Sequence, residues 1–490
     1  MDAPVPLILV SLLAAGALVL RNPRGQAAAM LGALLLAPII LGFHIADSDQ
    51  IQPLRDHPAL AAAGGVLAVL AVAALAVLFA KRPVWLPVAA AATLPFRVPI
   101  ASGGSTANLL VPLYLVVSAG TLAYAVPRLL GEERPERGRA GVLEWALAVY
   151  LALYGIQASY SDDFGRALEN VVFFYVPFAL LFALVARVPW TPRLARVCLG
   201  VLVVLALALV GVGFVEYATR HLFLNPKVIA SNQLEDYFRV NSLFFDPNIY
   251  GRFLAIVMLL LSAWLLWARR QREVVVGALL LVVLWAGLVL TFSQSSFTAL
   301  LIGLAVLGAM RWSVRWALLL SGAALVVAIA FVAIAPGAVH LELGNSKSAD
   351  KATSGRYDLI KGGVDLFRED PVVGKGSGAF ARDYRRAQHA SAERATSASH
   401  TIPVTIAAEQ GAIGLAAYLA LVLAGFLRLF RGARRMPERA AVAAAFTALV
   451  AHTMLYAAFL EDPLAWTLLG AGTAMALWPS AEREPAAAEA

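Results

Sequence analysis

The sequence predicts an all-α, polytopic transmembrane helical bundle of about 12 to 15 helices with one large extracytoplasmic loop, and three observations carry this prediction. The chain has 490 residues, of which 60% are hydrophobic and 14% charged, whereas soluble domains have roughly 45–50% and about 25%. The apolar residues form runs long enough to cross hydrocarbon about 30 Å thick, which takes roughly 20 residues per helix. The arginines gather in short clusters between these runs, as topology signals do. The net charge of +8 therefore indicates membrane orientation and not nucleic-acid binding.

Taken in order, the apolar runs define the elements of the predicted bundle. About fifteen runs qualify, near residues 4–20, 26–43, 58–80, 83–96, 108–126, 141–158, 166–187, 197–216, 249–268, 274–291, 295–310, 316–335, 403–427, 440–459 and 463–478. The run at 83–96 is short and ends in Pro95-Phe96-Arg97. The first run follows Asp2 and lacks the basic segment of a cleaved signal peptide, so we interpret it as a retained helix.

The orientation follows from the loops, because Arg-rich loops of membrane proteins lie in the cytoplasm. One alternate set of loops is rich in arginine: 21–24, 81–82, 127–139, 187–196, 268–273, 311–315 and 428–435. The other set holds acidic or long polar segments: 46–49, 159–163, 217–248, 336–400 and 460–463. This alternation places the N-terminus outside, the C-terminus inside, and both long segments on the outer face of the cytoplasmic membrane.

These elements divide the chain into five predicted parts. They are three extra N-terminal transmembrane helices (1–82), a first part of the core with an outer loop at 217–248 (83–335), the large extracytoplasmic loop (336–402), C-terminal transmembrane helices (403–479) and a cytoplasmic tail (480–490). The single Cys198 lies in an apolar run and excludes a disulfide framework.

The long polar stretch from Pro336 to His400 is expected to be functional, since connections above about 15 residues are usually functional or disordered. Ser354-Gly355 can cap a helix within it, whose apolar face would lie against the membrane or over a cavity and would consist of Tyr357, Ile360, Val364 and Phe367. The sequence PVVGKGSGAF (371–380) lacks the GxxxxGK[ST] pattern, which favours a tight turn over a phosphate loop.

Two arginines stand beside predicted helix starts on the outer face. Asp246 and Pro247 form an N-cap and first-turn pair, and Arg239 precedes them by a few residues. A guanidinium beside free N–H groups favours an anionic group such as phosphate, and a solvated arginine or a lipid-headgroup anchor is the structural alternative. Arg356 falls in a first turn, where the helix dipole disfavours a cation, so either an anionic ligand or solvent must compensate its charge.

His400 and Glu409 are the candidates for proton chemistry. His400 precedes Thr401-Ile402-Pro403 at the start of a helix, where the dipole favours the neutral imidazole that a general base needs. A lone histidine is more often structural, so this alternative stays open. Glu409 is an ionisable group in a membrane segment and hence a functional candidate. It is equally suited to pair with Arg252 or with a backbone group.

Asp162-Asp163 is an outer acidic pair that could hold a divalent ion, but the sequence offers no further oxygen ligand nearby. The remaining histidines, including His452, form no metal-ligand spacing, so we predict neither a metal nor a cofactor. The other polar groups lie at helix ends and are assigned to cavity lining (Arg166, Asn170), to an outer boundary (Arg97, Ser105, Asn108) or to close helix packing (Ser293, Gln294, Ser295, Ser296).

Four stretches together resemble the O-antigen ligase and polymerase family of bacterial membrane glycosyltransferases. In chain order they are FRVNSLFFDPNIYGRFLA (238–255), TFSQSSFTALLIGLAVLG (291–308), GRYDLIKGGVDLFREDPVVGKGSGAF (355–380) and SHTIPVTIAAEQGAIGLAAYL (399–419). The family has a GT-C-type fold with twelve core helices and a large periplasmic loop after the ninth. Omitting the first three runs here leaves nine before the loop and three after it, which agrees with that arrangement.

The resemblance implies a metal-independent, inverting transfer of a glycan from undecaprenyl pyrophosphate. It assigns the pyrophosphate-binding arginines to Arg239 and Arg356, the catalytic histidine to His400 and the acidic residue after it to Glu409. Arg166 is a third candidate for the pyrophosphate. Two positions depart from the family pattern, Thr401 in place of Asn and Gln294 in place of Arg, and both bear on the acceptor more than on the donor.

The sequence therefore predicts a surface-polysaccharide or lipopolysaccharide ligase that acts on the outer face of the cytoplasmic membrane. Its expected partners are a lipid-linked glycan donor, membrane lipid and a glycolipid, glycan or protein acceptor. Two alternatives remain open. A polymerase would join lipid-linked repeat units, and a transporter or flippase would move the same lipid-linked glycan without chemistry but should carry its charges at the bilayer midplane.

Overall fold

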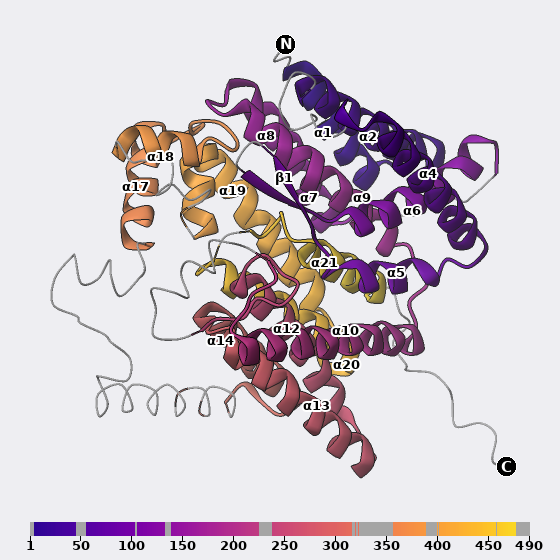
Figure 1. The fold of residues 1–490 in the computed structure, drawn as a ribbon, viewed down its shortest axis with the longest axis vertical. Coiled ribbons are helices and arrows are strands. Elements are labelled where there is room, and N and C mark those ends of the chain that lie inside the picture. Colours follow the sequence, from indigo (N-terminus) through magenta and orange to yellow (C-terminus); the bar gives the residue numbers. More distant parts are fainter. Residues whose placement is uncertain are drawn as a thin grey trace.

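A computed structural model of the protein confirms the polytopic helical bundle (Figure 1). It describes residues 4–45, 55–102, 105–132, 139–224, 238–315, 319, 322, 356–388, 399, 401–456 and 458–476. Nine of the helices in these ranges are long and apolar enough to cross a membrane. Each predicted apolar run overlaps at least one described helix, except the run at 316–335, which lies almost entirely outside the described residues.

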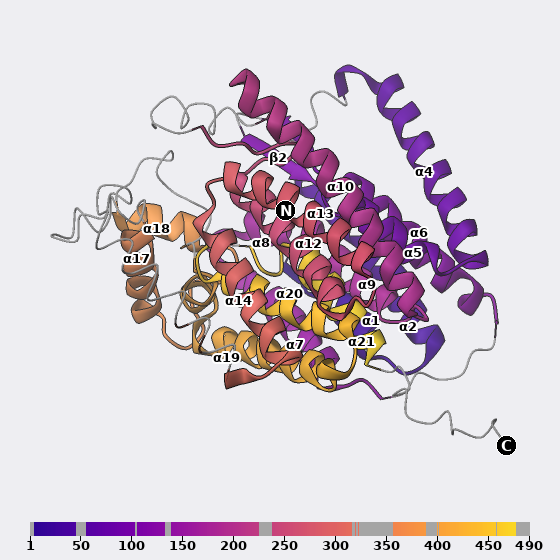
Figure 2. The ribbon, with the colours of Figure 1, turned by 90° about the horizontal axis from the view of Figure 1, so that it is seen from below.

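The N-terminal helices pack directly onto the rest of the bundle. They are α1 (Pro4–Val19), α2 (Pro23–Ile45) and α4 (Pro58–Lys81). Helix α1 packs against α7 (Val142–Gln157), and both α2 and α4 pack against α6 (Val111–Leu129). Figure 2 shows α4 along one edge of the bundle, where Phe79 is its one buried residue.

The run predicted at 83–96 is not a continuous membrane span, which corrects the sequence analysis. Helix α5 covers only Trp85–Thr93, about 14 Å at 1.5 Å per residue. The chain then leaves the helix before Pro95 and forms an antiparallel hairpin of β1 (Val98–Ser102) and β2 (Ser105–Leu109). The sequence did not predict this hairpin. The cause is local, because Pro95 and Pro99 cannot donate backbone hydrogen bonds within a continuing helix.

The middle of the bundle includes α12 (Pro247–Trp267), whose start is capped as its sequence predicts. Asp246 caps α12 by accepting a hydrogen bond from Asn248 N at 2.6 Å, and Pro247 occupies the first turn. The remaining helices of this region are α8 (Phe164–Asn170), a π-helical turn (Val171–Tyr175), α9 (Val176–Val185), α10 (Pro192–Thr219), α13 (Gln271–Leu290) and α14 (Gln294–Arg311).

The C-terminal helices complete the core around α12. They are α19 (Ile402–Phe430), α20 (Pro437–Thr453) and α21 (Pro463–Met475). Helix α20 packs against α12 and α14, and α21 packs against α9. Helix α19 is broken at Gly411, whose φ of 62° and ψ of −164° are not helical. This break positions the segment described next.

Two helices of the predicted large loop lie at the side of the bundle, next to α19 (Figures 1 and 2). They are α17 (Arg356–Glu369) and α18 (Phe380–Gln388). The predicted helix after Gly355 is confirmed, and Ile360, Val364 and Phe367 of its predicted apolar face are partly buried. Tyr357 is half exposed, and the buried positions are Leu359, Gly362, Gly363 and Leu366. The glycine pair allows this close approach, because a Cβ on Gly362 would lie 2.3 Å from Tyr384 Cε2.

Candidate active site

The glycine-rich segment 371–380 fills the break in α19, and Gly374 and residues 376–380 of this predicted water-facing stretch are buried. Gly376 N donates to Glu409 O at 2.8 Å, and Ala412 N donates to Pro371 O at 2.8 Å. Backbone groups freed by the break are thereby satisfied inside the protein, as a membrane segment requires. The predicted tight turn is confirmed, since Gly374, Gly376 and Gly378 all have positive φ. A Cβ on Gly374 would lie 2.4 Å from Glu409 O, so only glycine fits there.

The Glu409 side chain also accepts hydrogen bonds from the glycine-rich segment. Its Oε2 accepts from Gly378 N at 2.9 Å, and its Oε1 accepts from Phe380 N at 3.2 Å. Glu409 is 8% exposed. The sequence left open whether Glu409 pairs with Arg252 or with a backbone group. In the structure Glu409 binds backbone N–H groups, and Arg252 pairs with Asp462.

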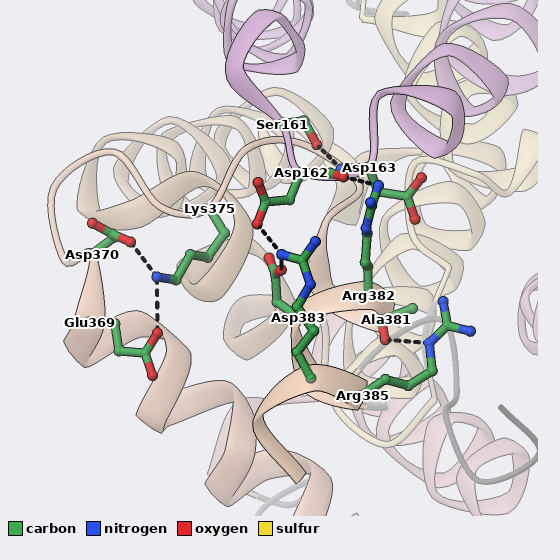
Figure 3. Close-up of polar contacts among 11 residues, drawn as sticks. Ser161, Asp162, Asp163, Glu369, Asp370, Lys375, Ala381, Arg382, Asp383 and Arg385 are labelled. Carbon is green, nitrogen blue, oxygen red and sulfur yellow. Dashed lines mark hydrogen bonds and ion pairs between the residues drawn. The ribbon is translucent and has the colours of Figure 1, made fainter. Parts of the chain in front are cut away.

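A cluster of charged residues ties α18 to the corner between α7 and α8 (Figure 3). Arg386 Nη1 lies 2.8 Å from Asp162 Oδ2 and 3.5 Å from Asp383 Oδ1. Burial, together with a hydrogen bond and repulsion from Asp162, raises the pKa of Asp383 from 3.8 to about 6. Asp163 caps α8 through Arg166 N. The acidic pair proposed as a metal site is thus engaged in an ion pair and a helix cap.

Lys375 closes the glycine-rich segment onto the end of α17. Its Nζ lies 2.5 Å from Asp370 Oδ2 and 2.9 Å from Glu369 Oε2 (Figure 3). Hydrogen bonds to Asp370 and Glu369 raise the pKa of Lys375 above its ordinary value. Both carboxylates are about half exposed, so we expect this contact to stabilise the surface turn only modestly.

Arg239 lies beside the first turn of α12, as its spacing predicted. Its Nη2 donates to Asn248 Oδ1 at 3.3 Å, and its Nε donates to Thr291 O at 3.0 Å at the end of α13. The guanidinium is partly buried. Two contacts from different helices fix the plane of the guanidinium, which is what bidentate recognition of a phosphate needs.

The serine patch connects Arg239 to a histidine that the sequence analysis set aside. Asn248 Oδ1 also accepts from Ser293 Oγ at 2.9 Å, and Ser293 Oγ lies 2.8 Å from Ser296 Oγ. His452 Nε2, from α20, lies 3.2 Å and 3.3 Å from the hydroxyls of Ser295 and Ser296. Close packing is confirmed as well, since a Cβ on Gly251 would lie 2.7 Å from Ser296 Oγ. The sequence did carry a signal for His452, because an ionisable residue within an apolar run is a functional candidate.

A buried ion pair lies deeper in the same end of the bundle. Arg252 Nη2 is 2.5 Å from Asp462 Oδ2, and the side chains are 1% and 2% exposed. Arg252 Nη1 also donates to Ala458 O at 2.8 Å, and Arg97 lies within electrostatic range of both charges. Arg252 is the sixth residue of α12, about 8 Å along its axis. The sequence analysis did not pair these residues, because 210 positions separate them and only the fold brings them together.

The other predicted site residues are only partly described. Arg166 pairs with Glu169 at 3.0 Å on the surface of α8 and is within electrostatic range of Glu409. Asn170 is buried and donates to Tyr154 Oη at 2.8 Å. His400 and the side chain of Arg356 lie outside the described part of the chain, although Ser399 before His400 is buried and donates through Oγ to Thr401 O at 2.7 Å.

The fold and this polar end define a polytopic membrane protein with charged and hydrogen-bonding groups collected around the starts of α12, α14 and α21. The family model described as O-antigen ligase matches residues 278–419. The match spans most of α13, all of α14, α17 and α18, and the first part of α19, and it contains three of the four stretches on which the resemblance was based. It confirms the predicted resemblance and supports an O-antigen ligase-like family for this chain. No curated protein matches the sequence.

Proposed function

We propose that this protein is a membrane glycosyltransferase that moves a glycan from an undecaprenyl-pyrophosphate-type carrier to an acceptor hydroxyl. The reaction would take place on the outer face of the cytoplasmic membrane. The observation that carries the proposal is the match to the O-antigen ligase family model over residues 278–419. The matched range includes the broken helix α19, the segment that fills its break and the sequence that leads to His400.

In the proposed reaction, Arg239 and Arg356 bind the pyrophosphate of the donor. The acceptor oxygen attacks the anomeric carbon on the face opposite the pyrophosphate, and the bond between that carbon and the pyrophosphate oxygen breaks. The bonding electron pair leaves with the carrier pyrophosphate, so negative charge develops there. Two guanidiniums stabilise this charge through hydrogen bonds that need no metal. His400 takes the proton of the acceptor hydroxyl as general base.

The contacts of Arg239 support its part in this scheme. Thr291 O and Asn248 Oδ1 hold the guanidinium at 3.0 Å and 3.3 Å beside the first turn of α12. A donor group that is oriented before substrate arrives loses less entropy on binding. The start of α12 adds backbone N–H groups and the positive end of the helix dipole on the same side.

Glu409 and Arg166 take supporting roles in this proposal. Both carboxylate oxygens of Glu409 already accept backbone hydrogen bonds from segment 371–380. We therefore propose Glu409 as a positioning residue that fixes the large loop against α19. Arg166 pairs with Glu169 at the rim, and its part in binding pyrophosphate would require it to exchange this partner for the donor.

A polymerase of lipid-linked repeats would use the same chemistry with a different acceptor. A transporter or flippase is the alternative from another class. The buried pair of Arg252 and Asp462 lies about 8 Å from the start of α12, near one end of the helix. This position favours an enzyme that works at one membrane surface over a carrier with charges at the midplane.

The lipid-linked glycan profile of a deletion strain tests the proposal and separates the alternatives. A ligase predicts long glycan chains stranded on the carrier, exposed at the outer leaflet. Single repeats on the carrier indicate a polymerase instead. Accumulation of the lipid-linked glycan at the inner leaflet indicates a flippase and contradicts an enzyme of either kind. Re-expression of the wild-type chain should restore the parental profile.

A further inference from the structure

Arg97, Arg252 and Asp462 form a cluster at the polar end of the bundle, termed here the two-arginine cluster. Arg97 belongs to the loop after α5, Arg252 to α12, and Asp462 caps α21. Arg252 Nη2 is 2.5 Å from Asp462 Oδ2, and Arg97 lies within electrostatic range of both charges. All three residues lie outside the matched family range 278–419, and the reaction proposed above gives them no part.

The arginines of this cluster have N–H donors without acceptors. The Nε of Arg97 is buried and has no hydrogen-bond partner within the described part of the chain. The same holds for the Nε of Arg252, whose side chain is 1% exposed. The neighbouring hydroxyl of Tyr114 is used elsewhere, since it donates to Phe173 O at 2.8 Å. A buried donor of a charged group is costly without an acceptor, so these arginines favour an anionic ligand.

Asp246 provides a second carboxylate near the cluster. Tyr456 lies within electrostatic range of Asp246 and of both arginines. Asp246 and Asp462 also cap α12 and α21, where the positive ends of two helix dipoles attract their charges. The formal charges of two arginines and two aspartates cancel. An incoming anion would therefore supply the missing acceptors for the guanidinium N–H groups, in charge-assisted hydrogen bonds.

An apolar cavity of about 130 Å³ adjoins the two-arginine cluster, between α5, α10, α12, α20 and α21. Ile256, in its lining, follows Arg252 by one turn of α12, and Leu94 precedes Arg97 by three residues at the end of α5. Along α12 the lining continues on the same face to Trp264. The cavity therefore begins beside the charges and runs away from the polar end.

The far end of this cavity lies near the starts of α10 and α20. Arg196 and Glu438, the two charged residues among the described residues that line it, stand in the first turns of these helices or just after them. Helix α10 packs against α5 and α12, and α20 packs against α12 and α21 (Figure 1). The rest of the lining is almost wholly apolar. A hydrocarbon chain that entered beside the cluster would thus be enclosed by helices.

An acidic head above apolar walls indicates a lipid phosphate as the ligand. Guanidiniums bind phosphate oxygens through planar sets of N–H donors, and the cavity removes a hydrocarbon chain from its surroundings. A phospholipid carries two chains for each phosphate, whereas a polyprenyl carrier has one chain. A single cavity that begins at the cluster favours the single-chain lipid.

The position of Arg239 agrees with a ligand that has two phosphates. Asn248, which accepts from Arg239 Nη2 at 3.3 Å, precedes Arg252 by four residues in α12. Residues four apart share a face of a helix and are separated by about 6 Å along its axis. One phosphate of a diphosphate can therefore meet Arg239 while the other meets the deeper arginines.

We propose that Arg97 and Arg252 bind the donor phosphate that is bonded to the polyprenyl chain, and that this chain enters the apolar cavity along α12 and α21. The sugar-bonded phosphate then lies at Arg239. This inference rests on the proposed function, because it locates the carrier that the reaction uses. It assigns the loop after α5 and the cap of α21 to donor binding.

Binding of undecaprenyl pyrophosphate to the full-length protein in phosphatidylcholine nanodiscs tests the phosphate contacts. Arg97→Gln should weaken this binding by about tenfold, as expected for the loss of a charge-assisted hydrogen bond. Arg97→Lys keeps the charge but lacks the planar set of donors and should weaken binding less. Arg220→Gln, at an exposed arginine after α10, is the control and should bind as the wild type does.

Ala471→Phe tests the course of the chain, because Ala471 of α21 lines the cavity and a larger side chain would narrow it. This variant should bind undecaprenyl pyrophosphate about tenfold more weakly. Its affinity should approach that of the wild type for farnesyl pyrophosphate, whose much shorter chain leaves most of the cavity empty. Ala420→Phe, at an exposed position of α19 outside the cavity, is the matched control and should not change binding.

Three outcomes overturn this inference. Wild-type protein that does not prefer undecaprenyl pyrophosphate to phosphatidylglycerol does so whether or not the variants fold. Wild-type affinity in Arg97→Gln, with glycan transfer by the wild-type chain intact, overturns it and leaves the proposed function standing. Wild-type affinity in Ala471→Phe shows that the chain lies elsewhere. Carrier binding that depends on Arg97 and Ala471 supports the site, and in a protein that transfers no glycan it counts against the proposed function alone.

Discussion

The carboxylate of Glu409 accepts a hydrogen bond of 2.9 Å from the backbone N–H of Gly378, 31 residues earlier in the chain. This contact joins a buried acidic side chain to a turn that sequence patterns place outside the membrane. Through this hydrogen bond, the broken region of α19 is connected to the large loop. The position of the loop helices α17 and α18 therefore depends on a residue that the loop does not contain.

Replacing Glu409 should loosen the loop before it affects chemistry. Glu409→Ala leaves two buried N–H groups without acceptors, each at a cost of about 1–3 kcal/mol. Glu409→Gln retains one acceptor oxygen and turns an NH₂ group toward the other donor. We expect faster hydrogen exchange at residues 374–380 in both variants, together with reduced transfer. Asp365→Asn, at a half-exposed carboxyl that pairs with Arg368 of the same helix, is the control. Normal protection of 374–380 with abolished transfer in Glu409→Gln would instead indicate a chemical role.

We expect donor-dependent transfer to require the planar set of N–H donors of Arg239 and not only its positive charge. Arg239→Ala should abolish donor-dependent transfer, and Arg239→Lys should restore only part of it, since lysine lacks the planar guanidinium. Asn248→Ala removes one orienting hydrogen bond and should weaken donor affinity by about two- to tenfold. Donor affinity and transfer are measured in nanodiscs. Arg220→Gln, at an exposed arginine close to Phe238, should behave as wild type. Full activity of Arg239→Lys contradicts the prediction.

His400 should affect the rate of transfer and not the binding of the donor. General-base catalysis contributes about 10²–10⁴-fold, so His400→Ala should slow single-turnover transfer by about that factor. His400→Gln keeps size and polarity but cannot take up a proton at neutral pH, so it should be nearly as slow. His221→Gln, at an exposed histidine after α10, is the control. Transfer at the wild-type rate by His400→Gln would falsify the general-base role.

The attachment of α18 should weaken as the pH rises. The pKa of Asp383 is raised from 3.8 to about 6 by burial and by Asp162. Between about pH 4 and pH 6 the folded protein therefore holds a proton that the unfolded chain releases. This contribution to stability is complete below about pH 4 and is lost as the pH rises through about 6.

Hydrogen-exchange protection of α18 measures this effect, with Lys375 and Arg386 unchanged as the neighbouring cations. Protection corrected for intrinsic exchange should decline from pH 4 to pH 7 in the wild type. Asp383→Asn should flatten the profile, while Asp365→Asn, at an exposed carboxyl of α17, should not. A wild-type profile in Asp383→Asn would show that another group titrates.

The predicted orientation can be tested with single cysteines. In a Cys198→Ala background, a cysteine at Asp365 should react with an impermeant maleimide added to intact cells, and one at Arg434 should react only after lysis. Both side chains are exposed, so burial does not decide the result. Reversed labelling would move the proposed reaction, and the polar groups around the starts of α12, α14 and α21 with it, to the cytoplasmic face.

The sequence by itself determined the membrane class, most of the helix ranges and the cap of α12. Apolar length and arginine spacing act along the chain, and Asp246 caps its own helix through a residue two positions away, so no tertiary information is needed. The family resemblance was also available from the sequence, since it rests on ordered short stretches.

The tertiary structure decided which of these residues meet. Arg252 and Asp462, Glu409 and Gly378, and Arg239 and His452 are brought into pairs or one network by packing between distant helices. The same packing selected Leu359 and the glycines of α17 as its buried face in place of the larger Tyr357 and Phe367. Periodicity measures how apolar a face is, whereas close approach depends on the shape of the partner surface, which exists only in the folded protein.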